Sequence, residues 1–434
     1  MSRPQAPRGT RDLLPAERAV FLRLEAIARD LTMRYGYQSI ETPLFEQAEV
    51  FERGVGAVTD VVEKELFRVQ AGRGDAERER WALRPEPTAG IVRAYVQHGM
   101  QTLPQPVKLT LVGPMFRYDR PQAGRYRQFW QFDVEALGDP GPAVDAEIIE
   151  LAARFFLEAG LPGVELRLNS IGDKVCRPAY IEALRAYFGP KADQLPELER
   201  QRLETAPLRL LDSKDPLMQP LIGEAPVITD LLCDACGAHF EGVQRHLAAL
   251  GVPVRLEPRL VRGLDYYTRT TFEFYPTGRD GQQDALGGGG RYDGLVELLG
   301  GKPTPGIGFG LGLDRVANAL AAAGVTTEVP HVPVVVVGAD PADTVTRLEV
   351  APRLRAAGVA ARAELGERKL GRQLESAAKE GAHLAVIVGD ELAASGLVQV
   401  RDLQAGTQRP VARTELAREV ARTQSQHRHG AGER

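Results

Sequence analysis

A break in the pattern of the sequence at Ala322–Pro333 divides the chain into two parts that have to fold differently. The break has no hydrophobic periodicity, and its Gly, Thr and Pro residues favour a loop. Beyond it, a strand-like run at Val334–Gly338 is followed by a helical stretch at Asp343–Ala357, and the alternation continues. Such a pattern predicts a small α/β domain with a largely parallel or mixed sheet. We place this domain at 331–424 and expect the polar tail, 425–434, to be disordered.

The first part of the chain, residues 1–325, mixes helices and strands in a less regular order. After Pro15, apolar residues recur at spacings of three and four, which predicts an amphipathic helix. Short strand-like runs follow, among them Val107–Val112 and Phe129–Ala136. Between about 172 and 255 the sequence is rich in Pro, Leu and charged residues, and we therefore expect an inserted helical module there.

Length and composition exclude several classes of protein. A chain of 434 residues with 43% hydrophobic and 26% charged residues is typical of a globular protein of two or three domains. It has no uninterrupted apolar run of about 18 residues and no apolar segment near its first residue, so we expect neither a membrane span nor a secretory signal. Three cysteines in a chain of this size fit the cytoplasm. The net charge of −4 argues weakly against a nucleic-acid binder.

Arginine is concentrated in the segment Phe116–Phe129, between two strand-like runs. Guanidinium groups bind phosphate oxygens in pairs and keep their charge, so a converging set of them suits a polyphosphate. In the second run, every other residue from Phe129 to Glu135 shares a face, and these side chains could form one wall of a site. Phe129 could offer its ring to a base. The alternative is a solvated hairpin with an Arg-rich loop.

Two glycine-rich segments indicate close approach of one backbone to another group. Gly306–Arg315 lacks the spacing of a dinucleotide-binding turn and follows a Pro-Gly loop instead of a strand. Alternating glycines in a strand let a ligand or another backbone come near, and Arg315 could then reach a phosphate from the next helix. The alternative is a packing strand with a surface Arg. Gly287–Gly290 could be a flexible linker or a similar wall beside a ligand.

Two shorter segments carry further candidate side chains. Arg262 stands close in the sequence to Tyr266 and Tyr267. The segment Leu83–Thr88 places a carboxylate and a hydroxyl on a turn, where an ammonium group could bind.

The Cys233-Asp-Ala-Cys236 segment raises the question of a zinc site. His239 and His246 follow it, and zinc could take these four side chains as ligands. Second ligand pairs are normally spaced more regularly, so we favour free thiols on a helical insert and expect no zinc. The seven histidines lie outside the other motifs, which disfavours a His-centred hydrolase triad.

Together these segments resemble the class II histidyl-tRNA synthetase family, in order and over nearly the whole chain. Gly113–Glu135 resembles motif 2 of the class, and Gly306–Arg315 resembles motif 3. Leu260–Tyr267 and Gly288–Asp293 are more discriminating, because they are similar to the paired histidine-specific signatures of the family. Ile40–Glu46 resembles motif 1, which in that family forms the interface of a homodimer.

The resemblance implies an α+β fold, with an antiparallel six-stranded catalytic sheet, a helical insertion and a C-terminal α/β anticodon-binding domain on a mixed sheet. It implies a cytoplasmic ligase that converts histidine and ATP to histidyl-adenylate and pyrophosphate. The histidyl group then passes to the terminal adenosine of the histidine-specific tRNA, and AMP is released. The implied partners are histidine, ATP with Mg²⁺, this tRNA and a second copy of the chain.

The resemblance also assigns roles to individual residues. Arg262 and Arg117 are the implied catalytic residues, which pair with the α-phosphate and the substrate carboxylate. Gln122 would contact the acceptor end of the tRNA, and Glu135 and Tyr267 would bond opposite nitrogens of the imidazole. The implied ATP-binding residues are Arg117, Arg125, Phe129 and Arg315. The implied histidine-binding residues are Glu86, Pro87, Thr88, Arg117, Gln131, Glu135, Arg262, Tyr266, Tyr267 and Tyr292.

Two other functions stay open at this point. A catalytically silent paralogue regulates the first enzyme of histidine biosynthesis and keeps the same catalytic fold. It typically lacks the anticodon-binding domain and has eroded signatures, whereas Arg262, Tyr266 and Tyr267 are present here. Another class II synthetase, specific for Pro, Thr or Gly, is disfavoured by the same segment.

Overall fold

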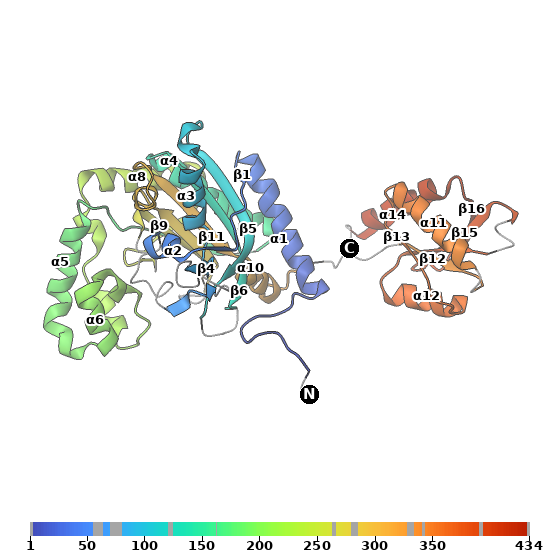
Figure 1. Cartoon of the computed structure of the whole chain (residues 1–434), viewed down its shortest axis with the longest axis horizontal. Coiled ribbons are helices and arrows are strands. Elements are labelled where there is room, and N and C mark those ends of the chain that lie inside the picture. Colours follow the sequence, from blue (N-terminus) through green and yellow to red (C-terminus); the bar gives the residue numbers. More distant parts are fainter. Residues whose placement is uncertain are drawn as a thin grey trace. The chain divides into compact units, whose positions relative to one another are not determined.

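The computed structural model of the chain separates into two units, residues 1–327 and 328–434, each with its own sheet (Figure 1). Within the described part of the chain, we find no helix with both the length and the apolar character needed to cross a bilayer. The structure describes residues 3–54, 64–69, 80–119, 125–161, 163–262, 266–278, 285–327, 334–340, 343–389 and 394–431, with side chains to residue 424.

A large sheet forms the centre of the first unit. Its middle strands, from β5 through β6, β11, β10 and β9 to β7, are antiparallel, which confirms the expected catalytic sheet. The very short strands β1 and β8 extend its two edges, where β1 pairs in parallel with β5 and β8 pairs in parallel with β7. The strands in sheet order are β1 (Gln38–Ser39), β5 (Val107–Phe116), β6 (Gln128–Leu137), β11 (Gly306–Gly312), β10 (Gly287–Arg291), β9 (Thr268–Pro276), β7 (Val164–Ser170) and β8 (Val254–Leu256).

Helices and a small second sheet complete this unit around the large sheet. The small sheet has the order β2–β4–β3 and lies next to α3 in the sequence. Its strands are β2 (Phe45–Gln47), β3 (Arg68–Val69) and β4 (Trp81–Leu83). The helices outside the insertion are α1 (Pro15–Arg34), α2 (Ala48–Gly54), α3 (Thr88–Gln97), the 3₁₀ turn η2 (Met100–Thr102), α4 (Pro142–Ala159), α9 (Leu295–Leu298) and α10 (Leu313–Ala322).

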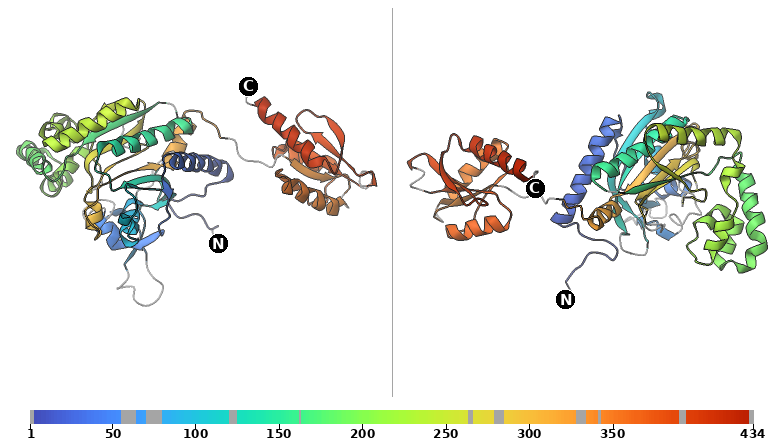
Figure 2. Two further views of the ribbon diagram at one scale, coloured as in Figure 1. Left: turned by 90° about the horizontal axis from the view of Figure 1, so that it is seen from above. Right: turned by 180° about the vertical axis from the view of Figure 1, so that it is seen from behind.

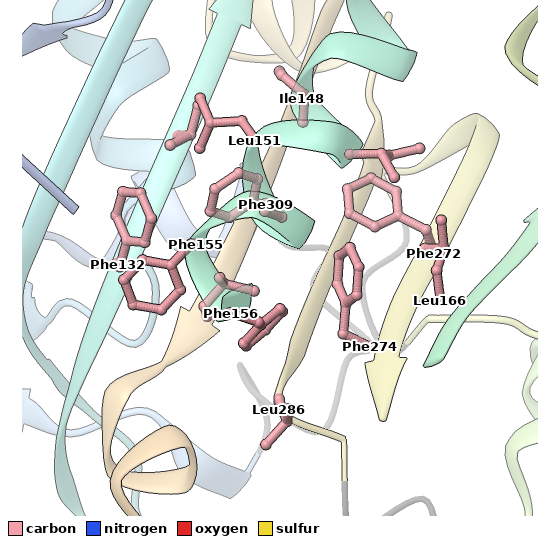
Figure 3. Close-up of a cluster of buried hydrophobic side chains, with 14 of the residues drawn as sticks. Phe132, Ile148, Leu151, Phe155, Phe156, Leu166, Phe272, Phe274, Leu286 and Phe309 are labelled. Atoms are coloured by element: carbon pink, nitrogen blue, oxygen red, sulfur yellow. The ribbon is translucent and has the colours of Figure 1, made fainter. Parts of the chain in front are cut away.

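Aromatic side chains from the strands and from α4 fill the core on one face of the large sheet (Figure 3). The ring of Phe132 on β6 lies 5.0 Å from that of Phe155 on α4 and 5.3 Å from that of Phe309 on β11. Each such buried ring contributes roughly 1.5–3 kcal/mol to stability. Because side chains alternate along a strand, burying Phe132 and Val134 here turns Asp133 toward the opposite face. The core therefore positions the polar wall of the site.

The helices of the insertion form a lobe at the edge of the first unit, away from α1 (Figure 2). The helix α8, which lies inside the expected insert, returns to the sheet and packs on α4. Its residues Phe240, Val243 and Leu247 belong to the core of the sheet, so this apolar face holds α8 there. The elements of this span are α5 (Arg177–Phe188), η3 (Gly189–Gln194), α6 (Glu197–Thr205), η4 (Pro207–Asp212), α7 (Met218–Glu224), η5 (Ile228–Leu231) and α8 (Asp234–Ala249).

The second unit is built on a five-stranded mixed sheet, as expected. Strands β13, β12 and β14 are parallel, and β15 and β16 continue the sheet antiparallel. Val334 and Val336 pack in one hydrophobic cluster and Val335 and Val337 in another, so both faces of β12 are covered. The elements are β12 (Val334–Gly338), α11 (Thr344–Ala356), β13 (Ala361–Ala363), α12 (Leu370–Lys379), β14 (Leu384–Val388), β15 (Leu397–Asp402), β16 (Gln408–Ala412) and α14 (Leu416–Ala431).

Two features of this unit differ from the sequence expectation. β16 was not expected, because its sequence is mostly polar and contains Pro410, which only an edge strand tolerates well. α14 runs to Ala431, so residues 425–431 are helical where the sequence led us to expect a disordered tail. No Pro interrupts this segment, and its first Gly comes near its end, so the helix that precedes it continues.

Candidate active site

A cavity of about 630 Å³ opens between the large sheet and the insertion lobe. Among its described lining residues, basic side chains outnumber acidic ones by nine to five, so the cavity favours an anionic ligand. The sequence-predicted residues that line it are Arg117, Arg125, Phe129, Gln131, Arg262, Tyr267 and Arg315.

The β5–β6 hairpin brings Arg117 and Arg125 to the cavity. Arg117 Nε donates to the carbonyl oxygen of Pro85 at 2.9 Å, and its guanidinium lies 5.4 Å from the centre of the Phe129 ring. Arg125 Nη1 lies 2.9 Å from Asp119 Oδ2. One bond to each arginine fixes its direction and leaves other N–H donors for a ligand.

Arg315 reaches the same cavity from the first turn of α10 and donates to the carbonyl of Ala285. Burial, together with the positive charges of Arg125, Arg117 and Arg262, lowers the pKa of Arg315 to about 10. The side chain is still charged at neutral pH. Four guanidinium groups that repel one another in one cavity favour an anion between them.

Arg262 forms an ion pair with Glu273 of β9, and Tyr275 donates a hydrogen bond to the same carboxylate. Arg262 Nε is buried and has no hydrogen-bond partner among the described residues. An unpaired buried donor at a cavity wall is open to a ligand acceptor. Sequence reasoning missed Glu273, which carries no motif signal of its own.

A layer of buried carboxyl and hydroxyl groups lies beneath the cavity wall. Thr88 Oγ1 donates to Glu135 Oε1 at 2.6 Å, and the hydroxyl of Tyr292 donates to the other oxygen of Glu135. Glu86 accepts from the backbone N–H groups of Thr88 and Ala89 at 2.8 and 3.0 Å, so it caps the N-terminus of α3. Residues 84–87 form the expected turn, and α3 begins directly after it at Thr88.

Burial shifts the protonation of this layer. It raises the pKa of Glu135 to about 8, although Thr88 and Tyr292 oppose the shift. It also raises the pKa of Glu86, and it raises that of Asp133 well above its usual range, with the charges of Glu135 and Glu86 adding to the effect. A cation placed beside carboxyl groups crowded in this way would stabilise their ionised form.

Unsatisfied acceptors mark the side of this layer that meets the cavity. Gln131 Oε1 and Asp133 Oδ2 are buried and have no hydrogen-bond partner in the described chain. Gln131 lines the cavity, and Asp133 stands two residues further along the same face of β6. An ammonium group would supply the missing donors.

Three tyrosines join the buried layer to the cavity. The rings of Tyr266 and Tyr267 lie 4.7 Å apart, and those of Tyr266 and Tyr292 lie 5.8 Å apart. Of the three, Tyr267 lines the cavity. The predicted residues that lie behind the lining are Glu86, Pro87, Thr88, Glu135, Tyr266 and Tyr292.

The alternating glycines of β11 make room for this layer. A Cβ at Gly308 would lie 1.8 Å from Glu135 Oε2, and one at Gly310 would lie 2.6 Å from Asp133 Oδ1. The space beside these glycines is therefore taken up by groups of the neighbouring strand β6. Gly287–Gly290 is part of the strand β10 in the middle of the sheet and not a linker.

The insertion lobe supplies lining residues that sequence reasoning did not select. They come from α5, α6 and the segment after it, and only the fold shows that they line the cavity. Gln122 and residues 263–265 of the histidine-signature segment lie outside the described residues. The basic lining residues of the insertion are Arg177, Arg185, Arg202, Arg209 and Lys214.

Comparisons with known proteins agree along the whole chain. The family model "Histidyl-tRNA synthetase" matches residues 9–316, and the model "Anticodon binding domain" matches residues 331–423. The histidine–tRNA ligase of Desulforudis audaxviator (strain MP104C) is 49% identical over 416 residues, which cover 96% of this chain and 98% of that protein. That of Moorella thermoacetica is 49% identical over 408 residues, 93% of this chain and 95% of that protein.

A solved structure shows the same architecture. The crystal structure of apo S. aureus histidyl-tRNA synthetase is similar with a TM-score of 0.80 and 33% sequence identity. The match covers 96% of this chain and 99% of that one, so both units are included.

Proposed function

The chain belongs to the histidyl-tRNA synthetase family, and on this premise we propose that it attaches histidine to its cognate tRNA with ATP. The histidine carboxylate attacks the α-phosphorus of ATP, histidyl-adenylate forms, and pyrophosphate leaves. The histidyl group then passes to the terminal adenosine of the tRNA, and AMP leaves. The observation that carries the proposal is a cavity in which converging arginines meet a layer of buried carboxyl groups.

The arginines would bind and activate ATP. A carboxylate is already a nucleophile, so adenylation requires alignment and positive charge more than a Ser-His pair. Arg117 and Arg262 would hold the α-phosphate and the histidine carboxylate, and Arg125 and Arg315 the outer phosphates. The lowered pKa of Arg315 supports this role, because a bound anion would offset the repulsion between neighbouring guanidinium groups. Phe129 and Arg315 would enclose the adenine, and Mg²⁺ would enter with the phosphates of ATP.

The buried layer would recognise histidine. Glu86, Thr88 and Gln131 would accept the ammonium group, which the unpartnered oxygen of Gln131 supports. Glu135 and Tyr267 would bond opposite nitrogens of the imidazole. A site that bonds both nitrogens rejects analogues, because its own polar groups are left unpaired with them. The neighbouring residues Pro87, Tyr266 and Tyr292 would hold this layer in shape.

The tRNA and a second copy of the chain are the proposed macromolecular partners. The match of residues 331–423 to an anticodon-binding domain supports tRNA recognition by the second unit, and Gln122 would contact the acceptor end. Leu44 and Phe45 are 43% and 51% exposed in the segment that resembles motif 1, which supports a homodimer through this region. ATP and tRNA are cytoplasmic, and we infer that the protein works there.

Amino-acid-dependent pyrophosphate exchange tests the proposed function. We expect exchange with histidine and none with proline, threonine or glycine. Exchange with one of the other three amino acids would assign the chain to another specificity of the class. Exchange with none of them would instead favour a catalytically silent relative.

A further inference from the structure

The three cysteines of the chain meet at one point together with an aspartate. Cys176 is distant in sequence from Cys233 and Cys236, yet the three sulfur atoms and a carboxylate oxygen of Asp173 all lie within 4.8 Å of one another. All three cysteines are free thiols. Sequence reasoning paired the CxxC segment with histidines, because it had no means of placing Cys176 beside it.

The fold builds this cluster from two separate turns at the base of the insertion. Asp173 and Cys176 lie in the turn between β7 and α5, where the N–H of Asp173 points to Cys176 Sγ at 3.4 Å. Cys233 immediately precedes α8, and Cys236 lies in its first turn. Gly172 permits the close packing, since its φ is +64° and a Cβ there would lie 2.6 Å from Cys176 Sγ.

We propose that Cys176, Cys233, Cys236 and Asp173 form a structural zinc site. Three thiolates and one carboxylate are a ligand set that zinc binds in tetrahedral geometry. A Zn–S bond of about 2.3 Å places tetrahedral sulfur ligands about 3.8 Å apart, so any two sulfur atoms have to approach by at most about 1 Å. Four protein ligands leave no open position, as in structural sites and unlike catalytic ones. This proposal replaces our sequence-based expectation of no zinc.

The histidine ligands that the sequence suggested are not needed in this arrangement. His239 is buried, and its Nε2 lies 2.9 Å from Asp145 Oδ2, so its ring is already held elsewhere. His246 lies near the end of α8, more than two turns beyond Cys236. The two candidate ligand sets therefore share Cys233 and Cys236 and differ in their other two members.

The surroundings of the cluster fit a metal with this ligand set. Three thiolates and a carboxylate carry four negative charges against two on zinc, and a neighbouring cation offsets part of the difference. Arg269 supplies that cation, with its Nη2 3.4 Å from Asp173 Oδ2. Such outer contacts orient the ligands of a metal site. Cys176 and Cys236 are buried while Cys233 and Asp173 are partly exposed, so an ion has a path to the cluster.

The position of the cluster indicates what the metal would stabilise. It would join the start of α5 to the start of α8, the first and last helices of the insertion. Arg177, which follows Cys176 directly, donates to the carbonyl oxygen of Tyr267 at 2.6 Å and to that of Gly172 at 3.1 Å. The metal would thus also hold the loop that supports the backbone of a cavity-lining tyrosine.

Metal analysis of the full-length chain, purified under reducing conditions and saturated with Zn²⁺ before desalting, tests the proposal. We expect one zinc per chain and a fall in Tm when a chelator removes it. Cys176→Ser should lose the zinc, while the matched variant His246→Ala should keep it. The opposite pattern, retention in Cys176→Ser and loss in His246→Ala, would overturn the proposed ligand set.

A second measurement covers the case in which Cys176→Ser fails to fold. Co²⁺ added to the metal-free wild-type chain should give thiolate-to-cobalt charge-transfer absorption of the strength that three thiolates produce. Absorption of two-thiolate strength, or no bound metal at all, would overturn the proposal. So would a wild-type protein that binds metal only after reduction of a Cys233–Cys236 disulfide present in cells, detected by mass spectrometry after trapping of free thiols. That result would make the cluster a redox pair.

Discussion

Glu135 is the residue whose charge state we expect to govern the binding of histidine. Burial raises its pKa to about 8, so the carboxyl is mostly protonated at pH 7. This protonation contributes stability that is present below the ordinary pKa of Glu and is lost as pH rises through about 8. An ionised carboxylate is the stronger acceptor for an imidazole N–H. We therefore expect kcat/KM for histidine to rise up to about tenfold between pH 7 and pH 9.

Glu135→Gln is the matched control, because it preserves the shape of the side chain and does not titrate. The imidazole and ammonium groups of histidine titrate identically with both proteins, so the difference between the two pH profiles isolates Glu135. We expect the variant to lose this component of the rise, and its KM for histidine to increase far more than its KM for ATP. Equal effects on the two KM values would remove Glu135 from the imidazole contact.

Arg262 is the residue whose loss should impair chemistry more than ATP binding. Removing a preorganised charged donor typically raises the barrier by about 3–4 kcal/mol, so Arg262→Ala should slow pyrophosphate exchange roughly 10²–10³-fold. Equilibrium binding of ATP should change little. Arg262→Lys keeps the charge without the paired donors, and we expect it to recover only part of the rate. Unchanged exchange in Arg262→Ala would exclude the proposed role.

At the scale of elements, the packing of β11 against β6 limits which substitutions the glycines of β11 tolerate. Gly308→Ala would place a methyl group 1.8 Å from Glu135 Oε2. Either the strand β11 or the Glu135 carboxylate would have to move. Overpacking of this kind costs about 1–3 kcal/mol, and we expect histidine activation to fall as well. Gly312→Ala on the same strand is the control, since its nearest contact would be 3.7 Å. Thermal unfolding and pyrophosphate exchange of the two variants check this, and equal behaviour would contradict it.

The buried pair of Arg291 on β10 and Asp145 on α4 ties the sheet to the helix that covers it. Burial alone raises the pKa of Asp145, but the hydrogen bond from His239 and the charge of Arg291 bring it below its usual value. Removing one partner of a fully buried pair costs about 3–5 kcal/mol, so Arg291→Leu should unfold at much lower urea than wild type. Arg34→Ala, which removes an exposed partner of Glu158, should leave the urea midpoint nearly unchanged. A small effect of Arg291→Leu would show that Asp145 finds another partner.

The sequence predicted elements well where one face of the chain is apolar, and it predicted the site where a motif is contiguous. The strand containing Phe129–Ala136 and the helix after Pro15 follow from periodicity alone. The capping of α3 by Glu86 and the insertion arginines that line the cavity do not. These depend on contacts between distant segments, which periodicity does not encode. The same limit hid Cys176 from its two partners.

At the scale of the whole molecule, net charge is a poor guide to the partner. The chain carries a net charge of −4, yet nine basic side chains gather among the described residues of one cavity. Phosphate binding depends on such local charge and not on the total. The weak argument against a nucleic-acid binder therefore does not hold, because the net charge averages over surfaces with different functions.

The division into two units leads to a prediction about how the two half-reactions depend on the chain. Among the described residues, the hydrophobic clusters of the first unit end at Val325 or before it, and those of the second unit begin at Val334. A chain truncated after Thr327 therefore keeps its own core and cavity, and we expect histidine-dependent pyrophosphate exchange within about tenfold of wild type, a loss below about 1.4 kcal/mol. Aminoacylation of tRNA should fall much further, because the part that matches an anticodon-binding domain is missing. If the truncated chain charges tRNA as well as the full chain does, the second unit has no role in tRNA recognition. If it folds but loses exchange, adenylation itself depends on the second unit, and the two half-reactions cannot be assigned to separate parts of the chain.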